Sequence, residues 1–256
     1  MPHSVPDNPF SSPSMRILII SDIHANLNAL EAVLSDAGEF DSCWCLGDLV
    51  GYGPDPNECI QLVRQFPNLM CLLGNHDAAA LNQIDIASFN PEARRALIWT
   101  QKTLSPESVE YLKERPERAE VEGVTLAHGS PRHPVWEYLL DTRTATQNFD
   151  HFETPFCFVG HSHLPAIYQK HEDRVYAEMI IPEVPGCIDM VPRAIFNPGS
   201  VGQPRDRDPR ASYAIYDAGS QVWDYRRVTY DVAGVQARML EVELPQRHIQ
   251  RLSSGW

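Results

Sequence analysis

Apolar runs alternate with amphipathic stretches along most of this chain. Three early runs, RILII (16–20), CWCL (43–46) and LMCLL (69–73), have the length and the residue types of buried strands. Each of them is followed by a stretch with apolar residues at helical spacing. The pattern therefore predicts strands that alternate with helices in the first part of the chain.

Residues typical of helix caps place the predicted helices. Proline or serine stands at several starts, and glycine or proline at several ends. The predicted helices are 27–38, ending at Gly38; 56–66, bounded by Pro56 and Pro67; 91–104; 105–115, with Ser105 as N-cap; and 231–243, capped by Asp231. The last residues, 251–256, are expected to fray.

The later apolar runs lie closer together. They are VTLA (124–127), PFCFV (155–159), AIF (194–196), SYAIYD (212–217) and QVWDYRRV (221–228). Strands that alternate with helices early and cluster late favour an α/β arrangement of mixed sheets over a purely doubly wound fold.

The chain divides into a short leader and one domain. Residues 1–14 are rich in proline and serine and lack periodicity, so a disordered leader is expected there. Met15 directly precedes the first predicted strand, and residues 15–256 are expected to form one domain. Within it, the segment 133–150 is expected to form a lid and residues 231–243 a C-terminal helix.

Charge and composition exclude several classes of protein. The formal net charge is -13, so the average field repels polyanions and argues against binding of nucleic acid or of an anionic membrane. No apolar stretch approaches the length of a membrane span, and the N-terminus lacks the apolar core of a secretory signal. We expect a cytoplasmic protein with a small-molecule partner; its oligomeric state stays open.

The six cysteines are expected to be free thiols, most of them buried. They lie mostly inside apolar runs, where a thiol behaves as a small hydrophobic group. A C-x-C at 43–45 raises the alternative of a metal site, but no second cysteine pair supports it.

Polar residues of metal-ligand type follow six of the predicted strands directly. They are Asp22 and His24; Asp48; Asn75, His76 and Asp77; His128; His161 and His163; and the run 197–200. Taken singly, each has a structural explanation as a turn or a loop histidine. Because loops at the carboxyl ends of strands converge in open α/β sheets, the ordered set predicts one shared site.

The types of donor in this set indicate metal chemistry. Carboxylate, amide and imidazole groups without thiolate favour Mn²⁺, Fe or Zn²⁺ over a closed structural zinc. Asp22 and His24 stand two residues apart at a strand end, as do His161 and His163, so each pair is expected to point the same way. Seven donors exceed the need of one ion that keeps an open position. Two ions bridged by a carboxylate account for the number.

The ordered motifs resemble those of a known superfamily. The series DIH (22–24), GD (47–48), GNHD (74–77), His128 and GHSH (160–163) is similar to that of the calcineurin-like metallophosphoesterases. NPGSVGQPRD (197–206) resembles the segment that follows in their compact bacterial and archaeal phosphodiesterase branch. The fold that this resemblance implies is a four-layer α/β/β/α sandwich of two mixed β-sheets.

The resemblance also implies roles for the residues. Two divalent ions are expected, Mn²⁺ first, with Fe, Zn²⁺ or Ni²⁺ as alternatives. The first ion would be held by Asp22, His24 and His163, the second by Asn75, His128 and His161, with Asp48 between them. His76 would be the catalytic general acid, and Asp77 is expected to orient its imidazole.

The implied activity is hydrolysis of a small phosphate ester, most simply a phosphodiester. A hydroxide shared by the two ions would attack phosphorus in line, with His76 facing the leaving oxygen. Gly51 and Tyr52 stand where the Ser/Thr protein phosphatase branch carries an acidic residue and an arginine, which argues against that branch. Three alternatives stay open: a phosphomonoesterase, a nucleoside polyphosphate hydrolase, and a metal-dependent interaction module without turnover.

Arginines near the motifs are candidate phosphate ligands. Arg132 follows His128 by four residues and Arg205 follows the NPGS turn, and guanidinium groups complement phosphate in a bidentate manner. The competing interpretation is a solvated charged loop. In the lid segment, Trp136 or Tyr138 could offer a stacking face, although core packing is the commoner role of such residues.

Overall fold

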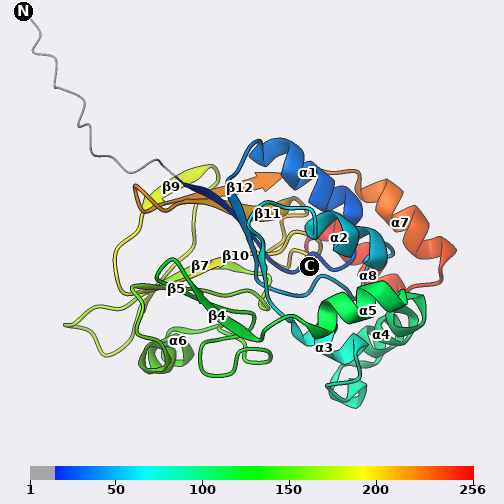
Figure 1. Cartoon of the computed structure of the whole chain (residues 1–256), viewed down its shortest axis with the longest axis horizontal. Helices are drawn as coiled ribbons and strands as arrows, with labels where there is room; N and C mark the ends of the chain where they lie inside the picture. The colour runs from blue at the N-terminus through cyan, green and yellow to red at the C-terminus, as the bar shows by residue number, and fades with distance from the viewer. Residues whose placement is uncertain (1–14) are drawn as a thin grey trace, which may run out of the picture.

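Two mixed β-sheets form the centre of the protein (Figure 1). The computed structural model describes residues 15–256, so the predicted leader, 1–14, lies outside the described residues. In the described part each sheet has six strands, in the orders β3-β2-β1-β11-β12-β9 and β4-β5-β6-β10-β7-β8. Strands β1, β2 and β3 are parallel, as are β5, β6 and β10, and the flanking strands pair antiparallel. The predicted α/β fold with mixed sheets is confirmed.

The strands and helices have the following bounds. The first sheet contains β1 (Arg16–Ile20), β2 (Ser42–Cys45), β3 (Met70–Cys71), β9 (Gly186–Asp189), β11 (Ala211–Asp217) and β12 (Val222–Val228). The second contains β4 (Arg118–Val121), β5 (Val124–Ala127), β6 (Phe156–Phe158), β7 (Pro165–Gln169), β8 (Glu178–Ile180) and β10 (Ala194–Pro198). The α-helices are α1 (Leu27–Ala37), α2 (Pro56–Val63), α3 (Asn75–Ala80), α4 (Pro91–Thr103), α5 (Pro106–Lys113), α6 (Thr142–Asn148), α7 (Val232–Glu241) and α8 (Gln246–Ser254).

Alternating side chains of β1 divide between two cores. Ile17 and Ile19 pack with Phe158 of the other sheet in the core between the sheets. Leu18 and Ile20 face the opposite way, into a core that the sheet shares with helices α1 and α2. Because successive residues of a strand point to opposite faces, one apolar strand seals two layers.

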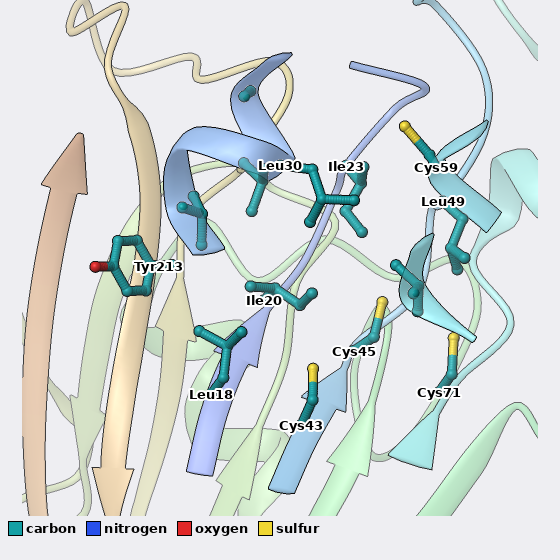
Figure 2. Close-up of a cluster of buried hydrophobic side chains, with 14 of the residues drawn as sticks. Leu18, Ile20, Ile23, Leu30, Cys43, Cys45, Leu49, Cys59, Cys71 and Tyr213 are labelled. Atoms are coloured by element: carbon teal, nitrogen blue, oxygen red, sulfur yellow. The ribbon is translucent and has the colours of Figure 1, made fainter. Parts of the chain in front are cut away.

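Figure 2 shows the core on the helix side of the first sheet. Cys43, Cys45 and Cys71 project from neighbouring strands to the same side as Ile20, into the core cluster that also contains Cys59 of α2. Burial raises the pKa of the Cys43 and Cys59 thiols well above the usual range, so they behave as small apolar groups. All six cysteines are free, as predicted, and all but Cys187 are buried.

The second sheet is covered on its outer face by α6 and the short turn after it. Ala145 of α6 and Phe149 pack there against Tyr168 and Ile195 of the sheet. The Tyr168 hydroxyl donates to the Leu139 carbonyl at 2.9 Å. Helices, sheet, sheet and helix therefore follow one another in four layers.

Most predicted helix boundaries agree with the structure. Gly38 ends α1 with a φ of 68°, and the side chains of Ser105 and Asp231 accept hydrogen bonds from the first turns of α5 and α7. Helix α2 ends at Val63, three residues before the predicted end. None of the helices in residues 15–256 is both long and apolar enough to cross a membrane.

The expectation that residues 251–256 fray is wrong. Helix α8 continues to Ser254, and Leu252 is buried in the core formed with α4 and α7. Beyond the helix, the Arg207 backbone N–H donates to the Gly255 carbonyl at 2.7 Å, and the Arg207 guanidinium lies over the Trp256 ring. Burial of an apolar helix face outweighs the tendency of a chain end to fray.

Candidate metal centre

The predicted ligands follow the carboxyl ends of parallel strands. Asp22 follows β1 and Asp48 follows β2, while His128 follows β5 directly. Asn75 opens α3 after β3, and the two histidines of GHSH follow β6. Both sheets therefore contribute loops to one place.

Most of these residues have a left-handed backbone conformation, which sets the direction of their side chains. The φ angles are 54° at Asp22, 48° at His24, 55° at Asp48, 63° at His161 and 58° at His163. The prediction that strand alternation points Asp22 and His24 the same way, and likewise His161 and His163, is wrong. Strands β1 and β6 end before these residues. For a residue with a Cβ, left-handed backbone costs about 1–2 kcal/mol, and such strain gathers at functional sites.

Asp22, His24 and His163 form the first cluster. His163 Nε2 lies 3.1 Å from His24 Nε2 and 3.2 Å from Asp22 Oδ1. His24 Nε2 lies 3.8 Å from the same carboxylate oxygen. Three ligand atoms from two separate segments, the loops after β1 and β6, thus face one point, as expected for a cation site.

Asp48, His128 and His161 form the second cluster, with Asn75 beside it. His128 Nε2 lies 3.2 Å from His161 Nδ1 and 3.1 Å from Asn75 Oδ1. The same nitrogen is 3.4 Å from Asp48 Oδ2. The structure therefore brings together all seven predicted ligands.

Asp48 lies between the two clusters. Its Oδ2 is 3.6 Å from His24 Nε2 on one side, as well as close to His128 on the other. Among the described residues, this oxygen and Asp22 Oδ1 are buried without a hydrogen-bond partner. Buried carboxylate oxygens are costly unless they are paired, so two orphaned oxygens facing imidazole nitrogens fit two bound cations.

Each ligand histidine turns its second ring nitrogen to a backbone carbonyl. The acceptors are Val50 for His24, Leu46 for His128, Gln203 for His163 and Trp136 for His161. An imidazole whose N–H donates to a carbonyl presents a lone pair at its other nitrogen. The support around the site therefore fixes the ring orientation and the tautomer that a metal ligand needs.

Burial keeps most of these imidazoles neutral. It lowers the pKa of His24 to about 3 and that of His163 well below its usual value. Burial also acts on His128, but the Asp48 carboxylate outweighs it and raises the pKa of His128 to about 9. For Asp48, burial is outweighed in turn by His128 and neighbouring imidazoles, which hold its pKa well below the ordinary range. His24 and His163 thus stay deprotonated, as metal binding requires, whereas a bound ion would have to displace a proton from His128.

His76 lies against the two clusters without joining either. Its backbone N–H donates to Asp48 Oδ1 at 2.8 Å, and its ring centre is 4.9 Å from that of His24. The rings of Tyr52 and Phe89 flank it at 4.3 Å and 5.0 Å. Burial lowers the pKa of His76 to about 3. The predicted catalytic histidine is therefore fixed in place next to the Asp48 carboxylate.

The expected contact between Asp77 and the His76 ring is not formed. Asp77 accepts the backbone N–H groups of Val50 and Gly74, each at 3.0 Å. In the described part of the chain, His76 Nδ1 is buried and has no hydrogen-bond partner. Burial and the Asp48 charge raise the pKa of Asp77 to about 7. Asp77 caps the start of α3 and so positions Asn75 and His76 through the backbone.

The two candidate arginines differ in their surroundings. Arg132 pairs with Glu137 and donates to Gln147, so its guanidinium is occupied within the segment 130–148. Arg205 Nη2 donates to the Tyr52 hydroxyl at 3.3 Å, and its charge acts on Asp22 of the centre. Arg205 therefore lies beside the centre without a carboxylate partner among the described residues, whereas Arg132 is bound to Glu137.

Aromatic side chains of the predicted lid segment line the second cluster. The Tyr138 ring stacks on the His161 ring at 3.8 Å and is 43% exposed. Trp136 is 40% exposed, and its ring meets Phe89 edge to face at 5.1 Å. These rings are part of the wall of the site, and their open faces point away from the packed core.

Several supporting residues could not be found by sequence reasoning. The Ser21 hydroxyl donates to Asp22 Oδ2 at 2.6 Å, and Asn197 Nδ2 donates to the Gly160 carbonyl at 2.7 Å. Tyr52 was singled out only as a departure from a related branch. The Asn197 contact joins residues that are 37 positions apart, so no local pattern indicates it.

Comparison with known proteins gives the same assignment. A family model described as the calcineurin-like phosphoesterase superfamily domain matches residues 15–221. A metallophosphoesterase from Sphaerobacter thermophilus, of known crystal structure, is 48% identical with a TM-score of 0.88, and the match covers 95% of this chain and 100% of that chain.

Two curated proteins add detail. An uncharacterized protein of Methanocaldococcus jannaschii is 35% identical over 93% of this chain and 98% of its own length. A symmetrical bis(5'-nucleosyl)-tetraphosphatase of Vibrio cholerae is 30% identical over 52% of this chain and 50% of its own length. With the matched domain and the paired ligand clusters, the chain belongs to the calcineurin-like phosphoesterase superfamily.

Proposed function

We propose that the protein is a dinuclear-metal phosphodiesterase that hydrolyses small phosphate esters. The observation that carries this proposal is the pair of orphaned carboxylate oxygens, Asp22 Oδ1 and Asp48 Oδ2, each facing imidazole nitrogens in a buried site. Ions bound there would supply Lewis-acid activation of water and of the phosphoryl group. The donor set without thiolate favours Mn²⁺, with Fe, Zn²⁺ or Ni²⁺ as alternatives.

The chain's own groups have separate tasks in this proposal. Arg205 would bind a phosphoryl oxygen, since a guanidinium complements phosphate geometry. His76 would hold a proton near the leaving oxygen. Burial favours the neutral ring of His76, and a phosphate anion beside it would raise its pKa again. Its proton affinity is therefore expected to increase when substrate is bound.

A nucleoside polyphosphate hydrolase is the second candidate. The observation that favours it is the likeness to the tetraphosphatase of Vibrio cholerae, which covers about half of each chain. Bis(5'-nucleosyl) tetraphosphate therefore belongs in the substrate panel beside a bis-aryl and a mono-aryl phosphate. The rank order of turnover among the three separates diesterase, monoesterase and polyphosphate hydrolase.

The test begins with chelator-treated protein. Hydrolysis of bis-p-nitrophenyl phosphate is measured after separate addition of Mn²⁺, Ni²⁺, Fe²⁺, Zn²⁺ or Mg²⁺, together with elemental analysis. Asp48→Ala should lose metal and turnover together, because its carboxylate lies between both clusters. His76→Ala should keep the metal and lose about 100-fold or more in turnover, the usual contribution of a general acid.

A histidine outside the site gives the matched control. His171 pairs with Glu178 on the second sheet, and His171→Ala should leave both metal content and turnover unchanged. Full activity of His76→Ala at equal metal content would contradict the proposed role of that residue. Two bound ions without turnover of any phosphate ester would instead favour the interaction module.

A further inference from the structure

Two arginines from distant parts of the chain meet at one amide oxygen. Arg205 Nη2 and Arg251 Nη1 donate to Gln203 Oε1, at 3.1 Å and 3.3 Å. Gln203 is buried, and its backbone carbonyl accepts the hydrogen bond that orients the ligand His163. Helix α8 thus brings the Arg251 guanidinium into contact with Gln203, which itself contacts His163 of the first cluster.

The charge of this pair is poorly compensated. Within residues 15–256, no side-chain carboxylate lies within 4.0 Å of either guanidinium, and Arg205 Nε is buried without a partner. Arg251 Nε donates to a main-chain oxygen of Trp256, the terminal residue, at 2.7 Å, and a terminal carboxylate there would compensate Arg251 in part, whereas Arg205 has no such partner. The nearby Arg210 and Arg227, by contrast, each pair with an aspartate. Two adjacent guanidiniums without a side-chain carboxylate between them are typical of a site that binds an anion.

The surroundings connect this pair to the catalytic side of the centre. The Tyr52 hydroxyl accepts from Arg205, and the Tyr52 ring lies 4.3 Å from that of His76. On the other side of Tyr52 lies His248 of α8, 2% exposed, with its ring at 4.5 Å. Neither ring nitrogen of His248 has a partner among the described residues. Polar groups that the fold leaves unsatisfied therefore gather beside His76.

Burial and the Arg205 charge also lower the pKa of Arg251. This direction is expected when like charges are held together away from water. An anion between the guanidiniums would relieve the repulsion.

We propose that Arg205 and Arg251 form a subsite for a second phosphoryl group of the substrate. The substrates it would select carry at least one phosphoryl group beyond the one that reacts, as nucleoside polyphosphates and bisphosphates do. The inference rests on the proposed function, because it takes the two metal clusters as the place where the first phosphoryl binds. Arg205 would lie between the two groups, and Arg251 would contact only the second.

Anion binding tests the subsite separately from catalysis. Inorganic phosphate and pyrophosphate are titrated calorimetrically into the full chain as purified, with elemental analysis before and after to verify that the metal content is unchanged. We expect pyrophosphate to bind at least tenfold more tightly than phosphate. Arg251→Gln should remove most of that difference, and Arg251→Lys should retain part of it because the charge remains.

The matched control lies on the same helix. The Arg247 side chain is 66% exposed, and Arg247→Gln should change neither affinity. Equal affinity for the two anions in the wild type would overturn the proposal, as would an unchanged preference in Arg251→Gln. Loss of phosphate and pyrophosphate binding to the same extent would indicate a site for free phosphate, and would also overturn it.

Turnover supplies the second readout. The ratio of kcat/KM for a bis(5'-nucleosyl) tetraphosphate to that for bis-p-nitrophenyl phosphate should fall about tenfold or more in Arg251→Gln, the effect of losing roughly one ion pair. An unchanged ratio would overturn the subsite. Absence of turnover with both substrates in the wild type would refute the proposed function alone, while the anion titration would still decide whether the subsite exists.

Discussion

Gly74→Ala is expected to remove the metal without unfolding the protein. Gly74 is the N-cap of α3, with φ of −90° and ψ of 172°, an extended conformation that alanine adopts freely. The obstacle is steric, because a Cβ on Gly74 would lie 2.0 Å from Asp48 Oδ1 and 2.3 Å from the Asp48 backbone nitrogen. Both the carboxylate between the two clusters and the backbone of Asp48 must therefore move.

The stability loss should be moderate. Forcing a methyl group into a packed region costs about 1–3 kcal/mol. In a protein of this size, each kcal/mol lowers Tm by about 2–4 °C. The effect on metal binding should be far larger, since Asp48 Oδ2 faces His24 on one side and His128 on the other. A shift of this carboxylate disturbs both clusters at once.

Gly38→Ala is the matched control. At Gly38 a Cβ would meet nothing within 4 Å, but φ is 68° and ψ is −146°, a conformation that costs other residues about 1–3 kcal/mol. Both variants should therefore lose similar stability, and only Gly74→Ala should lose metal in elemental analysis and the metal-dependent rise in Tm. Two ions bound to Gly74→Ala with wild-type activity would refute the reasoning.

Two further substitutions test the supports around the site. The Arg227 side chain is 3% exposed and pairs with Asp206 and Asp208 of the loop that carries Arg205. Arg227→Gln should lower the free energy of unfolding in urea by about 3–5 kcal/mol and raise KM. An unchanged KM would count against coupling between Arg227 and Arg205. Burial acts on Glu137, but hydrogen bonds led by that from Arg132 outweigh it and lower the pKa of Glu137 to about 2. A carboxyl group whose pKa is lower in the folded than in the unfolded protein stabilises the fold at pH values above the unfolded pKa. Glu137→Gln should therefore lower the free energy of unfolding by about 1–3 kcal/mol at pH 7, and by progressively less from about pH 4.3 downwards. A difference in unfolding free energy that stays constant across this range would show that the charge is not responsible.

Most of the buried strands could be predicted because they are apolar on both faces, although β7, which is also buried, was missed. Runs such as 16–20 and 155–159 face a core on each side and need no alternating pattern to be found. The edge strands β8 and β9 were missed for the opposite reason. In β8, Met179 and Ile180 are exposed, and β9 alternates between half-buried and exposed residues. Their pairing depends on the neighbouring strand, which their own sequence does not describe.

The short helices and α8 were missed for a different reason. Helix α3 has six residues, and capping by Asp77 holds it in place more than its own propensity does. In α8, Ile249 and Leu252 form its small apolar face among charged residues, a pattern that needs the surface of α7 to make a stable helix. For this reason the sequence did not place Arg251 near the site.

The ligands of the metal centre could be predicted because their order along the chain is distinctive, but what holds them could not. Four backbone carbonyls orient the four histidines, and a carbonyl is the same in every residue type. The sequence must instead determine the path of the backbone that places these carbonyls. Where the loop after β6 crosses the loop after β1, a Cβ on Gly160 would lie 1.9 Å from Ser21 Oγ, so the approach that lets the His161 N–H reach Asp22 Oδ2 requires glycine. A methyl group at Gly160 should therefore displace Asp22, although Gly160 itself is not among the predicted ligands.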